Sequence, residues 1–197
     1  MIEEYTQKKL QILVAKELIF DPLSMKNTSL IWQKEFDLNY AVGHDTSGKA
    51  HEFERRTNAR AAGSMTTTAS DYAKFIISTM GEKMLSENLR NELFTPQIKI
   101  SSKRGFGPQR DSMTTANEKI QLAWGLGFGL FNSKYGKAYF HGGHDDGWQN
   151  YAVCFSESKI AIVIMSNSSN FEPAAEGILN QCIGDVYSPL EWLGYLD

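Results

Sequence analysis

Hydrophobic residues follow a helical period in the first half of the chain and a strand-like period in much of the second half. Apolar residues at helical spacing predict a helix over residues 3–20. Asp21-Pro22 ends it, because a residue that precedes proline avoids helical dihedral angles. A second helix is predicted to follow Thr68 and to end at Gly81, since Thr68-Ala-Ser-Asp71 fits a capping box. Its predicted apolar face comprises Tyr72, Phe75, Ile76 and Met80.

Polar segments separate these helices from the rest of the chain. Residues 24–60 are irregular, and the basic cluster Arg55, Arg56 and Arg60 is interpreted as a solvated face, with binding of a substrate carboxylate as the alternative. Residues 82–94 predict a third, short helix. Residues 97–119 predict a long surface loop, which compact domains usually keep for a functional reason.

Strand-like patterns dominate the C-terminal part. In residues 124–130 large apolar side chains alternate with glycines, which predicts one strand whose bare face is approached closely by a packed element or a ligand. Further strands are predicted over residues 137–141, 150–155 and 160–165, with Ser156-Glu-Ser-Lys159 as a hairpin turn. Because residues 160–165 are apolar on both faces, we expect the sheet to be covered on both sides.

The order of these elements predicts an α+β fold with an antiparallel sheet and flanking helices. A closing helix is expected over Pro173–Val186. Its predicted apolar side comprises Ile178, Leu179, Cys182 and Ile183. Residues 1–120 then form the helical and loop region, and residues 121–197 the strands and closing helix, of the same domain.

Composition excludes several classes of protein. The 197 residues are 42% hydrophobic and 22% charged, which is typical of a globular chain with a real core. A net charge of −3 without a basic stripe argues against electrostatic binding to nucleic acid or to a membrane. No apolar run approaches the ~20 residues of a membrane-spanning helix, and none near the start suits a signal peptide, so the compartment stays open. Cys154 and Cys182 are expected to be buried free thiols.

Several segments, in order, resemble class C β-lactamase-like proteins. Phe20–Thr28 is similar to the family's Pro-Leu-Gly-Met-x-x-Thr segment, and Ala61–Phe75 to its Gly-Gly-x-x-Ser/Thr-x-x-Asp-x-x-x-Phe segment. Residues 124–128, 141–148 and 162–167 resemble its last three strands. The family includes class C β-lactamases, D-alanyl-D-alanine carboxypeptidases, low-molecular-weight penicillin-binding proteins and related esterases. The resemblance implies a β-lactamase-like sheet, part of the helical subdomain, and chemistry through a covalent acyl-serine.

The family's catalytic parts are a Ser-x-x-Lys at a helix start, a Tyr-x-Asn loop, and a Lys-Thr-Gly or His-x-Gly on a strand edge. The serine needs a nearby base, and the strand edge supplies a donor and a backbone N–H for the oxyanion. This chain carries the third part as His141-Gly142-Gly143. The resemblance implies that His141 acts beside the nucleophile as an electrophile or hydrogen-bonding group. It also implies that the His144 N–H, which follows Gly143, is the oxyanion donor.

The resemblance also implies residues that bind substrate. Gly142 departs from the Ser or Thr often found there, so a hydroxyl contact to a substrate carboxylate is missing. This departure favours the esterase or peptidase branch over β-lactam recognition. Trp148 and Gln149 follow the motif where the family lines its cleft, although Trp148 equally suits an ordinary core position.

No residue of this chain is expected to be the nucleophile. Ser156-Glu-Ser-Lys159 spells Ser-x-x-Lys, but a hairpin turn that runs into a strand offers no helix N-terminus to support it. Ser86-Glu-Asn88 spells the variant Ser-x-Asn outside the family's order and is attributed to chance. We therefore expect a C-terminal portion of a serine hydrolase, whose nucleophile lies before residue 1 and which is inactive alone.

Two other hypotheses stay open. The first is a non-catalytic binding or assembly module derived from the same fold. The second is a metal-dependent hydrolase that uses His141 and His144 near Asp145 and Asp146. His-x-x-His on a strand points its rings to opposite faces, so a polar turn is preferred and no metal or other cofactor is expected. Expected partners are a small ester, amide or peptide substrate and, at an uncovered sheet edge, a second copy or the missing half of the fold.

Overall fold

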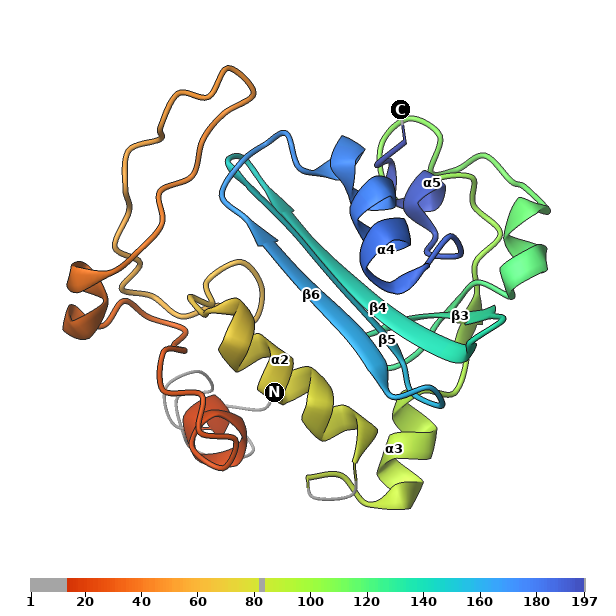
Figure 1. Cartoon of the computed structure of the whole chain (residues 1–197), viewed down its shortest axis with the longest axis horizontal. Helices are drawn as coiled ribbons and strands as arrows, with labels where there is room; N and C mark the ends of the chain where they lie inside the picture. The colour runs from red at the N-terminus through yellow and green to blue at the C-terminus, as the bar shows by residue number, and fades with distance from the viewer. Residues whose placement is uncertain (1–13, 82–83, 197) are drawn as a thin grey trace.

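A six-stranded antiparallel sheet forms the centre of the computed structural model, which describes residues 14–81 and 84–196 (Figure 1). The spatial order of the strands follows their order in the chain, so each strand pairs with the next. This meander confirms the predicted α+β class. The strands are β1 (Ile98–Lys99), β2 (Ala123–Trp124), β3 (Gly129–Ser133), β4 (Gly136–Asp145), β5 (Trp148–Phe155) and β6 (Ile160–Ser166).

Helices cover both faces of this sheet, as the apolar pattern predicts. In Figure 1, α2 lies along one face, and α4 and α5 lie against the other. The α-helices are α2 (Ala69–Met80), α3 (Glu87–Leu93), α4 (Ala175–Ile183) and α5 (Leu190–Leu193). A π-helix, η2 (Lys16–Phe20), and the short 3-10 helices η3 (Lys34–Leu38), η4 (Ala116–Ile120) and η5 (Glu172–Ala174) complete the described elements.

Each face of the sheet has its own core. On the α2 face, Ile76 packs with Tyr139 and Cys154, and the Tyr139 hydroxyl lies 2.6 Å from the Thr79 hydroxyl oxygen. On the opposite face, Leu179 of α4 packs with Phe140 and the other buried apolar side chains of that face, which form the larger of the two core clusters. We name these the α2 face and the α4 face. Side chains alternate between them along each strand.

The N-terminus of α2 is held by the predicted cap. The Thr68 side chain accepts a hydrogen bond from the Asp71 N–H at 3.2 Å. The Asp71 carboxylate is buried and accepts hydrogen bonds from the Asn27 N–H at 2.7 Å and the Lys74 ammonium at 2.6 Å. The Thr28 hydroxyl donates a further bond to it at 3.2 Å. Asp71 therefore ties the segment before residue 29 to α2.

The glycine-rich segment 124–130 is a hairpin, and the prediction of one continuous strand was wrong. Trp124 ends β2 and pairs with Gly129, which begins β3. The Gly125 N–H donates to the Phe128 carbonyl at 2.8 Å, and Gly127 has a φ of +88°. The predicted close approach does occur, because a Cβ on Gly129 would lie 2.2 Å from the Phe140 ring.

Several predicted boundaries also change. Strand β4 runs through Asp145, so His144 and Asp145 are strand residues and not a polar turn. The predicted loop 97–119 contains β1 and most of η4. Helices α3 and α4 are shorter than predicted, and the predicted helix over residues 3–20 lies largely outside the described residues. Burial of Cys154 is confirmed, but Cys182 is exposed, because it lies on the solvent side of α4.

Candidate active site

The proposed strand-edge motif lies where β4 extends past its neighbour. Strand β3 pairs with β4 only as far as Phe140, which faces Gly129. Strand β5 continues to pair with β4 as far as Asp145. Among the described residues, the edge of β4 that points away from β5 therefore has no strand partner from His141 to Asp145.

The backbone groups at this open edge follow from the register of the sheet. The Ser166 N–H donates to the Asn150 side chain of β5 at 3.2 Å, so it points toward β5. Successive N–H groups along a strand point to opposite edges, and the two residues of a hydrogen-bonded pair point their N–H groups at each other. The pairings of β4 with β5 and of β5 with β6 are unbroken, so the direction at Ser166 determines the directions along β4. The N–H groups of Gly142 and His144 therefore point to the open edge. Those of His141 and Gly143 point to β5.

The side chains of the motif divide between the two faces. His141 pairs with Ala152 of β5, and Gly143 pairs with Asn150. These positions lie on the α2 face of the sheet, as does Trp148. Gly142, His144 and Gln149 lie on the α4 face, where a Cβ on Gly142 would lie 2.9 Å from the Tyr195 hydroxyl. The structure therefore places His141, Gly143 and Trp148 on one side of the sheet, and the other three predicted site residues on the other.

His141 is exposed beside two aromatic rings. Its ring centre lies 6.0 Å from that of Trp124 and 6.5 Å from that of Phe128, both in edge-on arrangements. These rings come from the hairpin at residues 124–129 that the sequence pattern suggested was a single strand. Only recognition of that turn in the sequence could have placed Phe128 next to His141.

On the α4 face, His144 and Gln149 hold the segment that follows β6. His144 Nδ1 lies 2.7 Å from a Glu172 carboxylate oxygen. The buried Gln149 side chain accepts the N–H groups of Phe171 and Glu172 at 2.8 and 2.9 Å and donates to the Ser169 carbonyl at 3.0 Å. The Gln149 amide is thus engaged within the protein, and its part in substrate binding stays a prediction.

Residues 29–66 form a long loop, here named the arm, whose two ends are joined by the Ser29–Thr66 bridge. The arm packs against the end of the sheet that carries His144 and Trp148. Figure 1 shows it in orange to yellow, projecting from the body. A Cβ on Gly43 would lie 2.7 Å from the Trp148 indole nitrogen, so the arm covers Trp148. Arg56 of the predicted basic cluster lies 3.5 Å from an Asp145 carboxylate oxygen. The sequence carried no signal for this docking.

An aromatic cluster gives the arm a small core of its own. The Trp32 ring packs edge-on against Phe53 at 4.6 Å, and Tyr40 lies 4.2 Å from Phe53 between ring centres. The Arg55 guanidinium lies over both Trp32 and Phe53 and pairs with Asp37 at 2.9 Å. Hydrogen bonds from Arg55 and Trp32 lower the pKa of the Asp37 carboxyl from its ordinary value.

Other candidate sites lie elsewhere. Ser156 and Lys159 occupy the β5–β6 turn, at the end of the sheet away from His144. A groove of about 230 Å³ between α2 and β6, and a hollow of about 250 Å³ beside Tyr187–Trp192, do not include His141. Across residues 14–81 and 84–196, no three His, Cys, Asp or Glu side chains are placed to hold a metal. None of the helices in these ranges is long and apolar enough to cross a bilayer.

The Beta-lactamase family model matches residues 1–181 of the sequence. No curated protein sequence matches the chain. Among solved structures, the chain is similar to the octameric penicillin-binding protein homologue from Pyrococcus abyssi, with 20% identity and a TM-score of 0.71 over 99% of this chain and 42% of that one.

Two amide-cleaving enzymes also share the fold. The D-stereospecific amidohydrolase from Streptomyces sp. is 16% identical with a TM-score of 0.66, over 94% of this chain and 52% of that one. The D-amino acid amidase from Ochrobactrum anthropi is 22% identical with a TM-score of 0.59, over 85% of this chain and 46% of that one. The chain thus spans about half the length of these structures.

Proposed function

The chain belongs to the beta-lactamase family, and from this premise we propose that it forms the strand-side wall of an acyl-transfer site in a serine hydrolase. The observation that carries the proposal is the open edge of β4, where the His144 N–H points outward next to His141. A backbone N–H fixed in a strand is pre-oriented toward an incoming oxygen and needs no reorganisation during the reaction.

The chemistry proposed for this wall is stabilisation of a tetrahedral oxyanion. A serine hydroxyl attacks the carbonyl carbon of an ester or amide, and the carbonyl oxygen gains negative charge. The outward N–H of His144 donates to that oxygen, and the His141 ring donates or accepts a proton beside the attacking group. The alcohol or amine then leaves with a proton, and water hydrolyses the acyl-serine to the acid.

The nucleophile in this proposal comes from polypeptide outside these residues. Ser156 lies in the β5–β6 turn, far along the sheet from His141, and Lys159 adopts a left-handed φ of +53° there. The chain also spans about half of the structures that share its fold. We therefore expect the chain alone to bind but not to turn over substrate.

Small amides of D-amino acids, or related esters and peptides, are the substrate class that we propose. Two structures of similar fold are described as a D-stereospecific amidohydrolase and a D-amino acid amidase. Gly142 brings no hydroxyl to the site, which favours this class over β-lactams. The arm, which covers Trp148, borders the same end of the sheet.

A second candidate is a non-catalytic binding or assembly module. The absence of a suitably placed serine beside His141 among the described residues favours it. One structure of similar fold is described as octameric, so a second copy of this chain is one proposed partner. The missing half of the fold is the other proposed partner, because the chain covers 42% of that structure.

Two measurements on the purified chain test the proposal. With a fluorophosphonate probe or a fluorescent penicillin, we expect no covalent adduct, and the Ser156→Ala variant to behave identically. With D-phenylalanine amide, we expect the amide NMR signals of Gly142 and His144 to shift, and the shifts to weaken in His141→Ala. An adduct on any serine of this chain would contradict the external nucleophile. Signals that do not respond to the amide would favour the assembly module.

A further inference from the structure

The Tyr195 hydroxyl lies beside the open edge of β4 and has no hydrogen-bond partner among the described residues. The Tyr195 side chain is deeply buried, since the residue is only 4% exposed. Buried hydroxyl groups are normally hydrogen-bonded, so an exception of this kind requires an explanation. The hydroxyl oxygen itself is not sealed from solvent. A molecule that binds at the edge of β4 can therefore reach it.

The end of α5 fixes the position of Tyr195. Gly194 follows α5 with a φ of +84°, a left-handed conformation that glycine adopts without steric cost. The Tyr195 N–H then donates to the Leu190 carbonyl at 2.9 Å, which turns the chain back toward the helix. The Tyr195 ring packs edge-on against the Tyr151 ring, with the ring centres 6.1 Å apart. The hydroxyl is thus held at the end of a fixed ring.

The hydroxyl covers Gly142 on the α4 face. A Cβ on Gly142 would lie 2.9 Å from the hydroxyl oxygen, which is closer than side-chain contacts of this kind occur, so glycine leaves the space that the hydroxyl takes. The Gly142 N–H points to the open edge, as does the His144 N–H two residues further along. Alternate residues of a strand are roughly 7 Å apart. The edge thus offers two backbone donors, with the Tyr195 hydroxyl beside the first.

The charge near the Tyr195 hydroxyl favours a neutral ligand atom. Burial and the nearby Glu172 carboxylate raise the pKa of the hydroxyl, so it stays protonated at neutral pH and can donate. A ligand carboxylate placed there would be repelled by Glu172, whereas a carbonyl oxygen carries no net charge. The Gly142 N–H beside it is also a donor, so one carbonyl oxygen can accept from both groups.

We propose that the Tyr195 hydroxyl and the Gly142 N–H together bind a second carbonyl oxygen of the substrate. This binding mode rests on the proposed acyl-transfer site and narrows its substrates. The scissile carbonyl oxygen accepts from the His144 N–H, and alternate carbonyls of an extended peptide have the same spacing of roughly 7 Å as the two backbone donors. A simple amide has one carbonyl and reaches one donor. Neutral peptides and peptide amides of D-amino acids reach both and are the preferred substrates.

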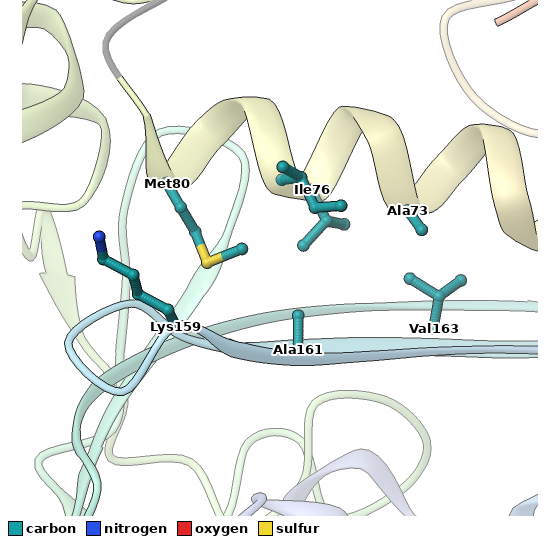
Figure 2. A pocket seen from close by; sticks show the side chains of 7 residues that line it. Ala73, Ile76, Met80, Lys159, Ala161 and Val163 are labelled. Carbon is teal, nitrogen blue, oxygen red and sulfur yellow. The ribbon is translucent and has the colours of Figure 1, made fainter.

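The groove between α2 and β6 is separate from this binding mode. Figure 2 shows Ile76 and Met80 of α2 directed toward Val163 of β6, on the opposite face of the sheet from Tyr195. Apart from Lys159, the side chains that line the groove are apolar. A peptide bound in that groove would leave the backbone signals of Gly142 unchanged, so the two places are distinguished by NMR.

The test compares ligands that differ in the second carbonyl, titrated into the whole chain and followed by amide NMR signals. N-acetyl-D-phenylalanyl-D-alanine amide has carbonyls at alternate positions, and D-phenylalanine amide has one. Tyr195→Phe removes the hydroxyl and keeps the ring. We expect it to weaken binding of the peptide amide roughly two- to tenfold and to leave binding of D-phenylalanine amide unchanged. Tyr40→Phe removes an exposed hydroxyl on the arm and is the matched control.

A second variant tests the geometry independently. Gly142→Ala sets a Cβ against the hydroxyl, so we expect it to weaken binding of the peptide amide and to add little to Tyr195→Phe, which frees the space. Equal affinity of wild type and Tyr195→Phe for the peptide amide, or tighter binding of the free acid N-acetyl-D-phenylalanyl-D-alanine, would overturn this role of Tyr195 and leave the acyl-transfer site intact. Failure of both amides to shift the Gly142 and His144 signals would overturn both proposals.

Discussion

Replacement of Asp71 tests how the N-terminal segment is fastened to the sheet domain. The Asp71 carboxylate accepts hydrogen bonds from Asn27 N–H, the Thr28 hydroxyl and the Lys74 ammonium. Asp71→Ala leaves the Asn27 N–H without its acceptor and removes the charge-assisted bonds. An unsatisfied donor costs about 1–3 kcal/mol and a bond to a charged group contributes a similar amount, so we expect a loss of about 2–4 kcal/mol in unfolding free energy. Asp71→Asn keeps the shape, and we expect it to cost less.

The pH dependence gives a second, independent signature. Burial raises the pKa of Asp71, but the opposite effect of Lys74, the Asn27 N–H and Thr28 is larger. The pKa in the folded protein therefore lies below the ordinary value of 3.8. A carboxyl whose folded pKa is depressed stabilises the protein above its unfolded pKa, and the contribution is lost as pH falls through the folded pKa. The stability difference between wild type and Asp71→Asn is therefore expected to be constant near neutral pH and to shrink in acid.

Urea unfolding at neutral and acidic pH, followed by circular dichroism, measures both effects. For a chain of this size the loss corresponds to a fall in Tm of roughly 4–16 °C. An Asp71→Ala variant within about 0.5 kcal/mol of wild type would refute the reasoning, because that is the range of ordinary surface substitutions. A difference between wild type and Asp71→Asn that grows in acid would refute the assigned direction of the pKa.

Two further predictions concern the core. Gly129→Ala sets a Cβ 2.2 Å from the Phe140 ring and is expected to lower the unfolding free energy by about 1–3 kcal/mol. Gly177→Ala, in α4 with open space around it, is the control and is expected to be neutral or stabilising by up to about 1 kcal/mol in the same urea titration. Burial raises the pKa of the Cys154 thiol to about 11, whereas Cys182 is exposed. Ellman's reagent is therefore expected to modify Cys182 in the native protein and Cys154 only after unfolding, and fast reaction of both would contradict the described core.

Local patterns predicted much of this fold because they depend on neighbours in sequence. The cap at Thr68 and the apolar period after it specify α2, and the two-sided apolar run at Ile160–Met165 specifies a sheet covered on both faces. The segment 124–130 misled because alternating glycines fit both an extended strand and a tight turn. In the structure the Gly125 N–H donates to the Phe128 carbonyl and Gly127 adopts a positive φ, and these two features make the segment a turn.

The sequence identified the residues of the candidate site better than it predicted their arrangement in space. Placing His141 on a strand followed from its neighbours, but the open edge beside it depends on where β3 begins, and the predicted bounds of β3 were wrong. The division of His141 and His144 between two faces follows from strand period alone. The docking of Gly43 on Trp148 joins residues far apart in the chain, and no local pattern encodes such a contact.

Amide hydrogen exchange at the four residues of the β4 motif tests the central claim most directly. If β4 runs past β3 with an open edge, the N–H groups of Gly142 and His144 exchange quickly, while those of His141 and Gly143 are protected by β5. Protection of all four, or the opposite alternation, would mean that no free backbone donor stands beside His141. The proposed wall of an acyl-transfer site would then be wrong.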